Sequence, residues 1–162
     1  DSLKTGYTSE AGYCLVASAK KDGQRLISVV LGASSTESRA QESQKLLTYG
    51  MRFFETHVLY DAQEELTQAR VWGGAQDYID LTVEQELAVT IPRGQAKYIG
   101  ATMNINPEIQ MPIQKGAILG KLVINLDEDV IAERDLIAVN AMQKGRFFKG
   151  VADSIKRMIS DE

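Results

Sequence analysis

The first third of the chain alternates short apolar runs with turn residues. Apolar and β-branched residues fill 13–20 and 25–31, and Asp22-Gly23 lies between these runs. Asp-Gly in this position is typical of a β-hairpin, because the tight turn needs positive φ. A further short run occupies 3–7. The pattern therefore predicts strands at 3–7, 13–20 and 25–31.

A helical pattern follows these runs. Ser34 and Glu37 fit a capping box, in which two side chains satisfy free N–H groups at the start of a helix. Apolar residues then recur at spacings of three and four on one face, namely Leu46, Leu47, Gly50, Met51 and Phe54. We predict a helix over about 37–55.

After His57 the chain changes to short apolar runs separated by glycine, proline and charged residues. Residues 87–91 and 122–126 alternate apolar and polar positions, as strands with one buried face do. Short strands at regular intervals predict an all-β sandwich or barrel. The predicted strands are 66–72, 78–83, 87–91, 98–105, 117–126 and 130–139.

These changes of pattern divide the chain into segments 1–57, 58–143 and 144–162. The first segment holds strands and a helix that leave one sheet face uncovered and one edge unpaired. We interpret it as the end of a larger α+β domain, followed by a β-rich, sandwich-like domain. In the last segment one helical stripe predicts a short amphipathic helix, formed by Phe147, Phe148, Val151, Ile155, Met158 and Ile159.

Composition narrows the classes of function. Hydrophobic residues make up 44% and charged residues 25%, as in globular domains. The net charge of −4 argues against a nucleic-acid partner, which requires a basic surface. His57 is the single histidine and Cys14 the single cysteine, so we predict neither a metal site nor an internal disulfide. Because the chain begins with Asp1 rather than Met, we expect it to be a piece of a longer protein.

Lys4-Thr5-Gly6, in the first predicted strand, carries the candidate chemistry. A cation and a hydroxyl on a strand edge suit a ligand that ends in a carboxylate. Glycine lets a bound group approach the backbone closely. A strand edge offers N–H and C=O groups to an extended peptide, and an N–H there can stabilise an oxyanion. The triplet is common in turns, so the surrounding sequence decides its meaning.

The surrounding sequence resembles a known enzyme family. Residues 1–8, 11–19, 25–32 and 39–56 resemble the last strands and last helix of the catalytic domain of serine-type D-Ala-D-Ala carboxypeptidases, the low-molecular-mass penicillin-binding proteins. Further phrases resemble their β-rich C-terminal domain, namely Arg70-Val71-Trp72-Gly73, Thr90-Ile91-Pro92-Arg93-Gly94 and Pro112-Ile113-Gln114-Lys115-Gly116. The resemblance implies a parent enzyme that removes the terminal D-Ala from peptidoglycan pentapeptide through an acyl-enzyme, and that β-lactams acylate.

The same resemblance implies the substrate-binding residues. Lys4, Thr5 and Gly6 match the family's third motif, with Lys4 giving positive potential and Thr5 a hydroxyl to the substrate carboxylate. The residue after the motif, Tyr7, gives a backbone donor for the oxyanion. Arg39 matches an arginine near the start of the last helix that can reach the carboxylate. The chain departs from the pattern at Ser2, where glycine is usual, and at Tyr7, where histidine or threonine is frequent.

The family's nucleophile motif is not present in usable form. Ser18-Ala19-Lys20-Lys21 matches Ser-x-x-Lys formally, but it lies at the end of a predicted strand, where residues three apart point to opposite faces. No Ser-x-Asn occurs in the chain. We therefore predict no catalytic residue and no activity for this chain alone.

The resemblance also implies partners and a location. Peptidoglycan pentapeptide and β-lactams are the expected ligands, without a cofactor. Residues 147–159 are expected to lie on the outer face of the cytoplasmic membrane, which makes the protein periplasmic; the alternative is that this stripe packs on the β-rich domain. A second hypothesis is a non-catalytic β-sandwich module that binds or spaces.

Overall fold

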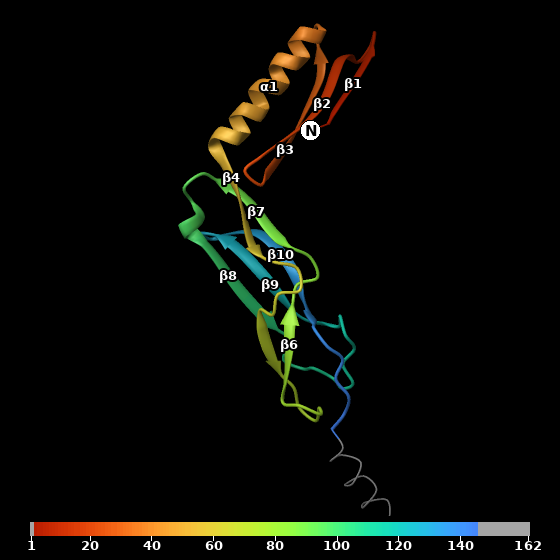
Figure 1. The fold of residues 1–162 in the computed structure, drawn as a ribbon, viewed down its shortest axis with the longest axis vertical. Coiled ribbons are helices and arrows are strands. Elements are labelled where there is room, and N and C mark those ends of the chain that lie inside the picture. The colour runs from red at the N-terminus through yellow and green to blue at the C-terminus, as the bar shows by residue number, and fades with distance from the viewer. Residues whose placement is uncertain (1, 146–162) are drawn as a thin grey trace, which may run out of the picture. The chain divides into compact units, whose positions relative to one another are not determined.

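The computed structural model describes residues 2–145, which are mostly β-sheet with one long helix (Figure 1). The predicted fold class is therefore confirmed as a mostly β-sheet chain with one helix. The predicted C-terminal helix lies outside the described residues. The elements are β1 (Leu3–Thr8), β2 (Gly12–Lys21), β3 (Gln24–Ala33), α1 (Thr36–Phe53), β4 (Phe54–Tyr60), β5 (Thr67–Arg70), β6 (Tyr78–Thr82), β7 (Leu87–Pro92), η1 (Ala96–Tyr98), β8 (Ile99–Ile105), β9 (Ile118–Leu126) and β10 (Asp129–Ala138).

The described chain forms two compact units. The first contains the residues up to His57 together with Val89–Lys97, and the second contains Val58–Ala88 and the residues from Tyr98 onward. The prediction of three segments, with a first boundary near residue 57, stays a prediction. No helix among residues 2–145 is long and apolar enough to cross a membrane.

The first unit contains an antiparallel sheet in the order β1-β2-β3, with α1 packed on β2 and β3. The predicted hairpin is confirmed, because Asp22 and Gly23 both have positive φ, 50° and 82°. The Ser28 and Ser43 hydroxyls are hydrogen-bonded between β3 and α1, and both residues are buried. A side chain at Gly50 would overlap Leu26, so small residues allow the helix to approach the sheet closely.

Two details of the predicted helix are wrong. The N-cap is Ser35 rather than Ser34, because the Ser35 hydroxyl accepts the Ser38 N–H at 3.0 Å. Within the predicted apolar face, Leu46 is 51% exposed, whereas the other four residues are half-buried. The buried Ser43 lies on the same face of α1, beside the half-buried Leu47 and Met51.

Arg93, in the turn after β7, caps the C-terminus of α1. The Arg93 guanidinium donates to the carbonyl oxygens of Met51 and Phe54, both at 3.0 Å, and of Arg52 at 3.2 Å. Carbonyls in the last turn of a helix have no partner within the helix, and a cation suits the negative end of the helix dipole. One side chain therefore satisfies several of these groups and holds the turn against the helix end.

Glu55 completes this cap. Its Oε2 lies 3.3 Å from Nη1 of Arg93, and its Oε1 accepts the Gly94 N–H at 2.9 Å. Nε2 of His57 lies 3.2 Å from Oε1 of Glu55. The Gly94 N–H, followed by His57, lowers the pKa of the Glu55 carboxyl, which therefore stays ionised near neutral pH.

The second unit contains a five-stranded antiparallel sheet in the order β5-β6-β10-β9-β8. Buried residues lie in β5, β6, β9 and β10, and Leu81, Leu122 and Leu136 are 0% exposed. All six predicted strands after residue 57 are present, with ends that differ from the prediction by at most two residues. The prediction missed β4, which pairs with β7 as a separate two-stranded sheet, because residues 54–55 were assigned to the helix.

We predict that Arg93→Ala lowers the free energy of unfolding by about 1–2 kcal/mol, because it removes donors from carbonyls at the end of α1. Urea denaturation followed by circular dichroism at the helical band would measure the loss. Arg134→Ala is the matched control, since Arg134 is exposed and its Nη1 donates to the carbonyl oxygen of its neighbour Glu133. Equal stability of the two variants would contradict the role of Arg93 as a cap.

Candidate functional site

The predicted site residues Lys4, Thr5, Gly6 and Tyr7 lie together on β1, the edge strand of the first sheet. Every residue of β1 is exposed. Thr5 pairs with Leu15, which is buried on the side of α1, so the Thr5 side chain lies on the helix side of the sheet. The Lys4 side chain lies on the opposite side, and the two functional groups therefore flank the strand edge.

The register shows which backbone groups of β1 are available to a ligand. The Ser18 N–H donates to the Ser2 carbonyl at 2.9 Å, which makes this a hydrogen-bonded pair. Hydrogen-bonded pairs alternate along antiparallel strands, so every second residue after Ser2 directs its N–H and C=O toward β2. The N–H and C=O groups of Thr5 and Tyr7 consequently point away from β2, toward the free edge.

Gly6 leaves open space at this edge. A Cβ built on Gly6 meets no atom within 4 Å, and its φ lies outside the left-handed region. Gly12, by contrast, has a φ of 66° and a crowded Cβ position. The fold therefore requires glycine at position 12, whereas at position 6 glycine only keeps the approach to the backbone free.

Arg39 of α1 reaches the candidate site from the helix side. Its Nη1 donates to the carbonyl oxygens of Gly6 and Cys14, each at 3.1 Å, and these residues are paired across β1 and β2. The Arg39 guanidinium lies 5.6 Å from the centroid of the Tyr13 ring, and Tyr13 lies 4.5 Å from the ring of Tyr7. Arg39 thus braces the edge strand, and its predicted contact with a substrate carboxylate stays a prediction.

Tyr13 is the residue of this cluster that the sequence did not single out. It pairs with Tyr7 across β1 and β2, and this cross-strand aromatic pair supports the end of the edge strand. Because Tyr7 and Tyr13 lie six positions apart on either side of the turn before Gly12, a hairpin register could have predicted that they face each other. Ser18 lies in β2 and accepts a hydrogen bond from Arg25 at 2.6 Å, so its Ser-x-x-Lys match is not on a helix.

Comparison with protein families places the chain. The model for the C-terminal domain of penicillin-binding protein 5 matches residues 54–144. The chain belongs to this family. The model for D-alanyl-D-alanine carboxypeptidase matches residues 1–35, the part that contains the edge strand. The resemblance stated from the sequence is therefore confirmed.

Individual relatives agree with the family. The chain is 40% identical over 159 residues to D-alanyl-D-alanine carboxypeptidase DacA of Escherichia coli, which covers 98% of this chain and 40% of the relative. It is 38% identical over 148 residues to DacF of Bacillus subtilis, covering 91% of this chain and 38% of the relative. The structure of penicillin-binding protein 5 from Haemophilus influenzae matches with a TM-score of 0.82 and 38% identity, over 87% of this chain and 42% of that one. The chain thus spans about two fifths of the length of these relatives.

We predict that Arg39→Ala speeds amide exchange at Lys4 and Gly6 about tenfold, because β1 loses the brace that links it to α1. Hydrogen exchange followed by NMR would report each amide. Arg25→Ala is the control, since Arg25 lies in β3 and donates to the Ser18 hydroxyl of β2 rather than to β1. Unchanged amide exchange at Lys4 and Gly6 in the Arg39 variant would contradict the proposal that Arg39 braces β1.

Proposed function

We propose that this chain is the C-terminal portion of a serine-type D-Ala-D-Ala carboxypeptidase that removes the terminal D-Ala from peptidoglycan pentapeptide. The enzyme is acylated by its peptide substrate, and by β-lactams, on a serine that this sequence does not contain. The observation that carries the proposal is the free edge of β1, where the Lys4 and Thr5 side chains flank outward N–H groups. The names of the relatives, D-alanyl-D-alanine carboxypeptidases, support the same reaction.

The edge strand suits each part of that reaction. An extended peptide adds to the free edge of β1 through backbone hydrogen bonds. Its terminal carboxylate accepts a hydrogen bond from the Thr5 hydroxyl in the positive potential of Lys4, to which Arg39 adds a second charge. When the serine attacks the peptide carbonyl, the Tyr7 N–H stabilises the oxyanion, and D-Ala leaves as the tetrahedral intermediate collapses. The open space beside Gly6 admits the acyl group.

The first unit belongs, in this proposal, to the end of a larger transpeptidase-like α+β domain. The sheet face opposite α1 carries Val16, Ile27, Val29 and Leu31, which are 41%, 66%, 55% and 72% exposed. Contiguous apolar side chains of this size on a sheet face normally pack against another layer. A preceding part of the same domain is the layer that this proposal assigns to the face.

The other proposed parts follow from the family and the sequence. Residues 58–143 form a sandwich-like spacer domain. The second hypothesis, a non-catalytic module that spaces or binds, is compatible with this role for the domain. The segment 144–162 lies on the outer face of the cytoplasmic membrane through residues 147–159, so the protein is periplasmic. Support for this anchor comes from the apolar stripe beside Lys149, Lys156 and Arg157.

In the full-length protein that contains the serine, Gly6→Ala should reduce the rate of acylation by a fluorescent penicillin about tenfold, roughly 1.4 kcal/mol of barrier. The added methyl group blocks the approach of the acyl group to β1, whereas the fold has room for it. Time-resolved labelling on gels would give the rate. Gly100→Ala is the matched control, because Gly100 lies in the edge strand β8 and its Cβ position is equally open.

Failure of the full-length protein to label at all would overturn the carboxypeptidase proposal. Equal labelling rates for Gly6→Ala and Gly100→Ala would instead remove β1 from the acyl-binding site. Circular dichroism and melting curves of both variants are expected to match the parent protein, which separates a blocked site from a misfolded one.

The chain should float with phosphatidylglycerol vesicles in a density gradient, and Phe148→Asp/Ile155→Asp should stay at the bottom, because two charges interrupt the apolar stripe. A matched variant, Lys121→Asp, changes charge in the β-rich unit and should float as before. Flotation of the double variant would contradict the membrane anchor. Failure of the parent chain to float would do the same.

A further inference from the structure

Trp72 is the feature of the second unit that neither the fold nor the proposed catalysis explains. It is the only tryptophan in the sequence, and it is 73% exposed in the turn between β5 and β6. Tryptophan carries a large apolar surface that domains usually bury or use in binding. An exposed tryptophan in a fixed turn is therefore a candidate ligand contact.

The turn that carries Trp72 is held from several sides. The Val71 N–H donates to the Asp77 carbonyl at 2.9 Å, which closes the turn. The Gly145 N–H donates to the Gly73 carbonyl at 2.9 Å, so the segment before residue 146 lies against the turn. A side chain at Gly74 would overlap Met111 and Met142, so these side chains pack directly on the glycine. The position of Trp72 is thus set by three separate chain segments.

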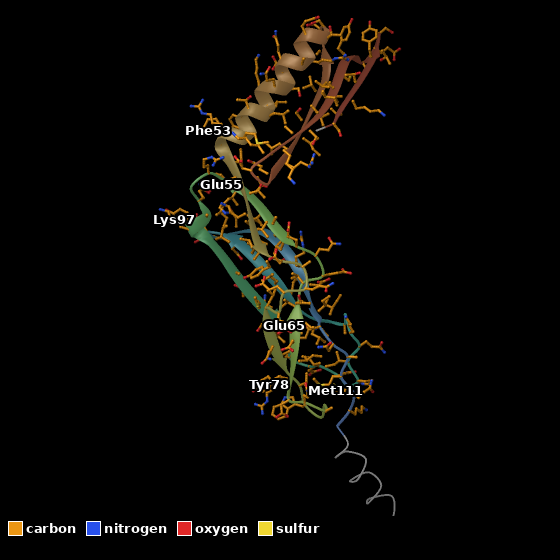
Figure 2. All side chains as sticks on the ribbon, viewed as in Figure 1. Phe53, Glu55, Glu65, Tyr78, Lys97 and Met111 are labelled. Atoms are coloured by element: carbon orange, nitrogen blue, oxygen red, sulfur yellow. The ribbon has the colours of Figure 1, made fainter. Side chains whose placement is uncertain are left out.

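A hollow of about 410 Å³ opens beside Trp72. It is lined by Trp72, Gly73, Gln110, Met111 and Lys144. Figure 2 shows Met111 and Tyr78, the first residue of β6, at the same end of the second unit. The Arg70 guanidinium lies 4.1 Å from the centroid of the Trp72 ring, and Arg70 does not line the hollow. A ligand there meets a flat aromatic wall, a thioether, an amide and an ammonium group.

We propose that this hollow binds a sugar ring of a glycan. A pyranose has an apolar C–H face and a rim of hydroxyl groups, which match the indole ring on one side and the polar side chains on the other. In the bound state the C–H face lies on Trp72, while the Gln110 amide and the Lys144 ammonium bond the hydroxyls. Arg70 holds the ring from outside the hollow through a cation–π contact.

The polar groups in the hollow favour a glycan over a lipid surface. Tryptophan beside cations also suits a membrane interface, where the ring inserts among headgroups. Trp72 is 73% exposed, but it borders a shallow hollow that also contains the Gln110 amide, which finds hydrogen-bonding partners on a sugar and none on a lipid tail. Small ligands bind in such concave sites, with apolar walls and a few placed polar groups. The glycan proposal rests on the proposed function in one respect, because the substrate peptide of that function belongs to a glycan polymer.

The test uses the full chain and the fluorescence of its one tryptophan. Titration with tetra-N-acetylchitotetraose should give a saturable change of Trp72 emission and protect Trp72 from acrylamide quenching. Gln110→Ala should weaken binding about fivefold, the size of one lost neutral hydrogen bond. Gln85→Ala is the matched control, because Gln85 lines a different hollow of the same unit. Gln110 and Gln85 are both exposed, so both variants should keep the parent's circular dichroism.

Two results would overturn the proposal. One is the lack of a saturable emission change up to the solubility limit of the sugar, and the other is equal affinity of Gln110→Ala and the parent chain. A blue shift with phosphatidylglycerol vesicles, without a response to the sugar, would assign the hollow to lipid and also overturn it. Acylation by penicillin in the full-length protein is measured separately, so failure of the glycan site and failure of the carboxypeptidase proposal are distinguishable.

Discussion

The antiparallel pairing of β1 with β2 is the constraint on which the candidate site depends. This register turns the N–H and C=O groups of Thr5 and Tyr7 to the free edge and leaves Lys4 and Thr5 on opposite sides of it. A shift by one residue would exchange these roles, since the side-chain period of a strand is two. Thr5 and Tyr7 would then direct their backbone N–H and C=O groups toward β2 instead of toward the free edge.

Arginines on other elements secure this register and the end of the helix. Arg39 donates from α1 to carbonyls of both β1 and β2, and Arg93 donates to carbonyls at the end of α1. Both side chains bond backbone groups of other segments, a task that suits the planar guanidinium with its several donors. Arg39 therefore braces the edge strand, and its contact with a substrate carboxylate stays a prediction.

Local patterns identified most of the strands, because alternation and the Asp-Gly turn act over short distances. They did not separate α1 from β4, since Phe54 continues the helical spacing and the helix ends only where Arg93, about forty residues later, caps its carbonyls. The N-cap moved by one residue because Ser34 and Ser35 offer the same hydroxyl. The triplet Lys4-Thr5-Gly6 could be identified from the sequence. The contact of Tyr13 with Tyr7, which supports the edge strand, could not, because it depends on the register between β1 and β2.

The exposure of β1 limits what this edge can do alone. Lys4 and Thr5 are open to water, and an ion pair between exposed groups contributes only about 0–1 kcal/mol. Outward N–H groups also bond water until a ligand displaces it. Hydrogen bonds that stabilise an oxyanion become strong only in a site that excludes water and holds its donors in place. In the proposed carboxypeptidase, the edge strand therefore supplies the geometry of carboxylate recognition, and the strength of that recognition requires a second surface that covers the apolar face and the edge of this sheet.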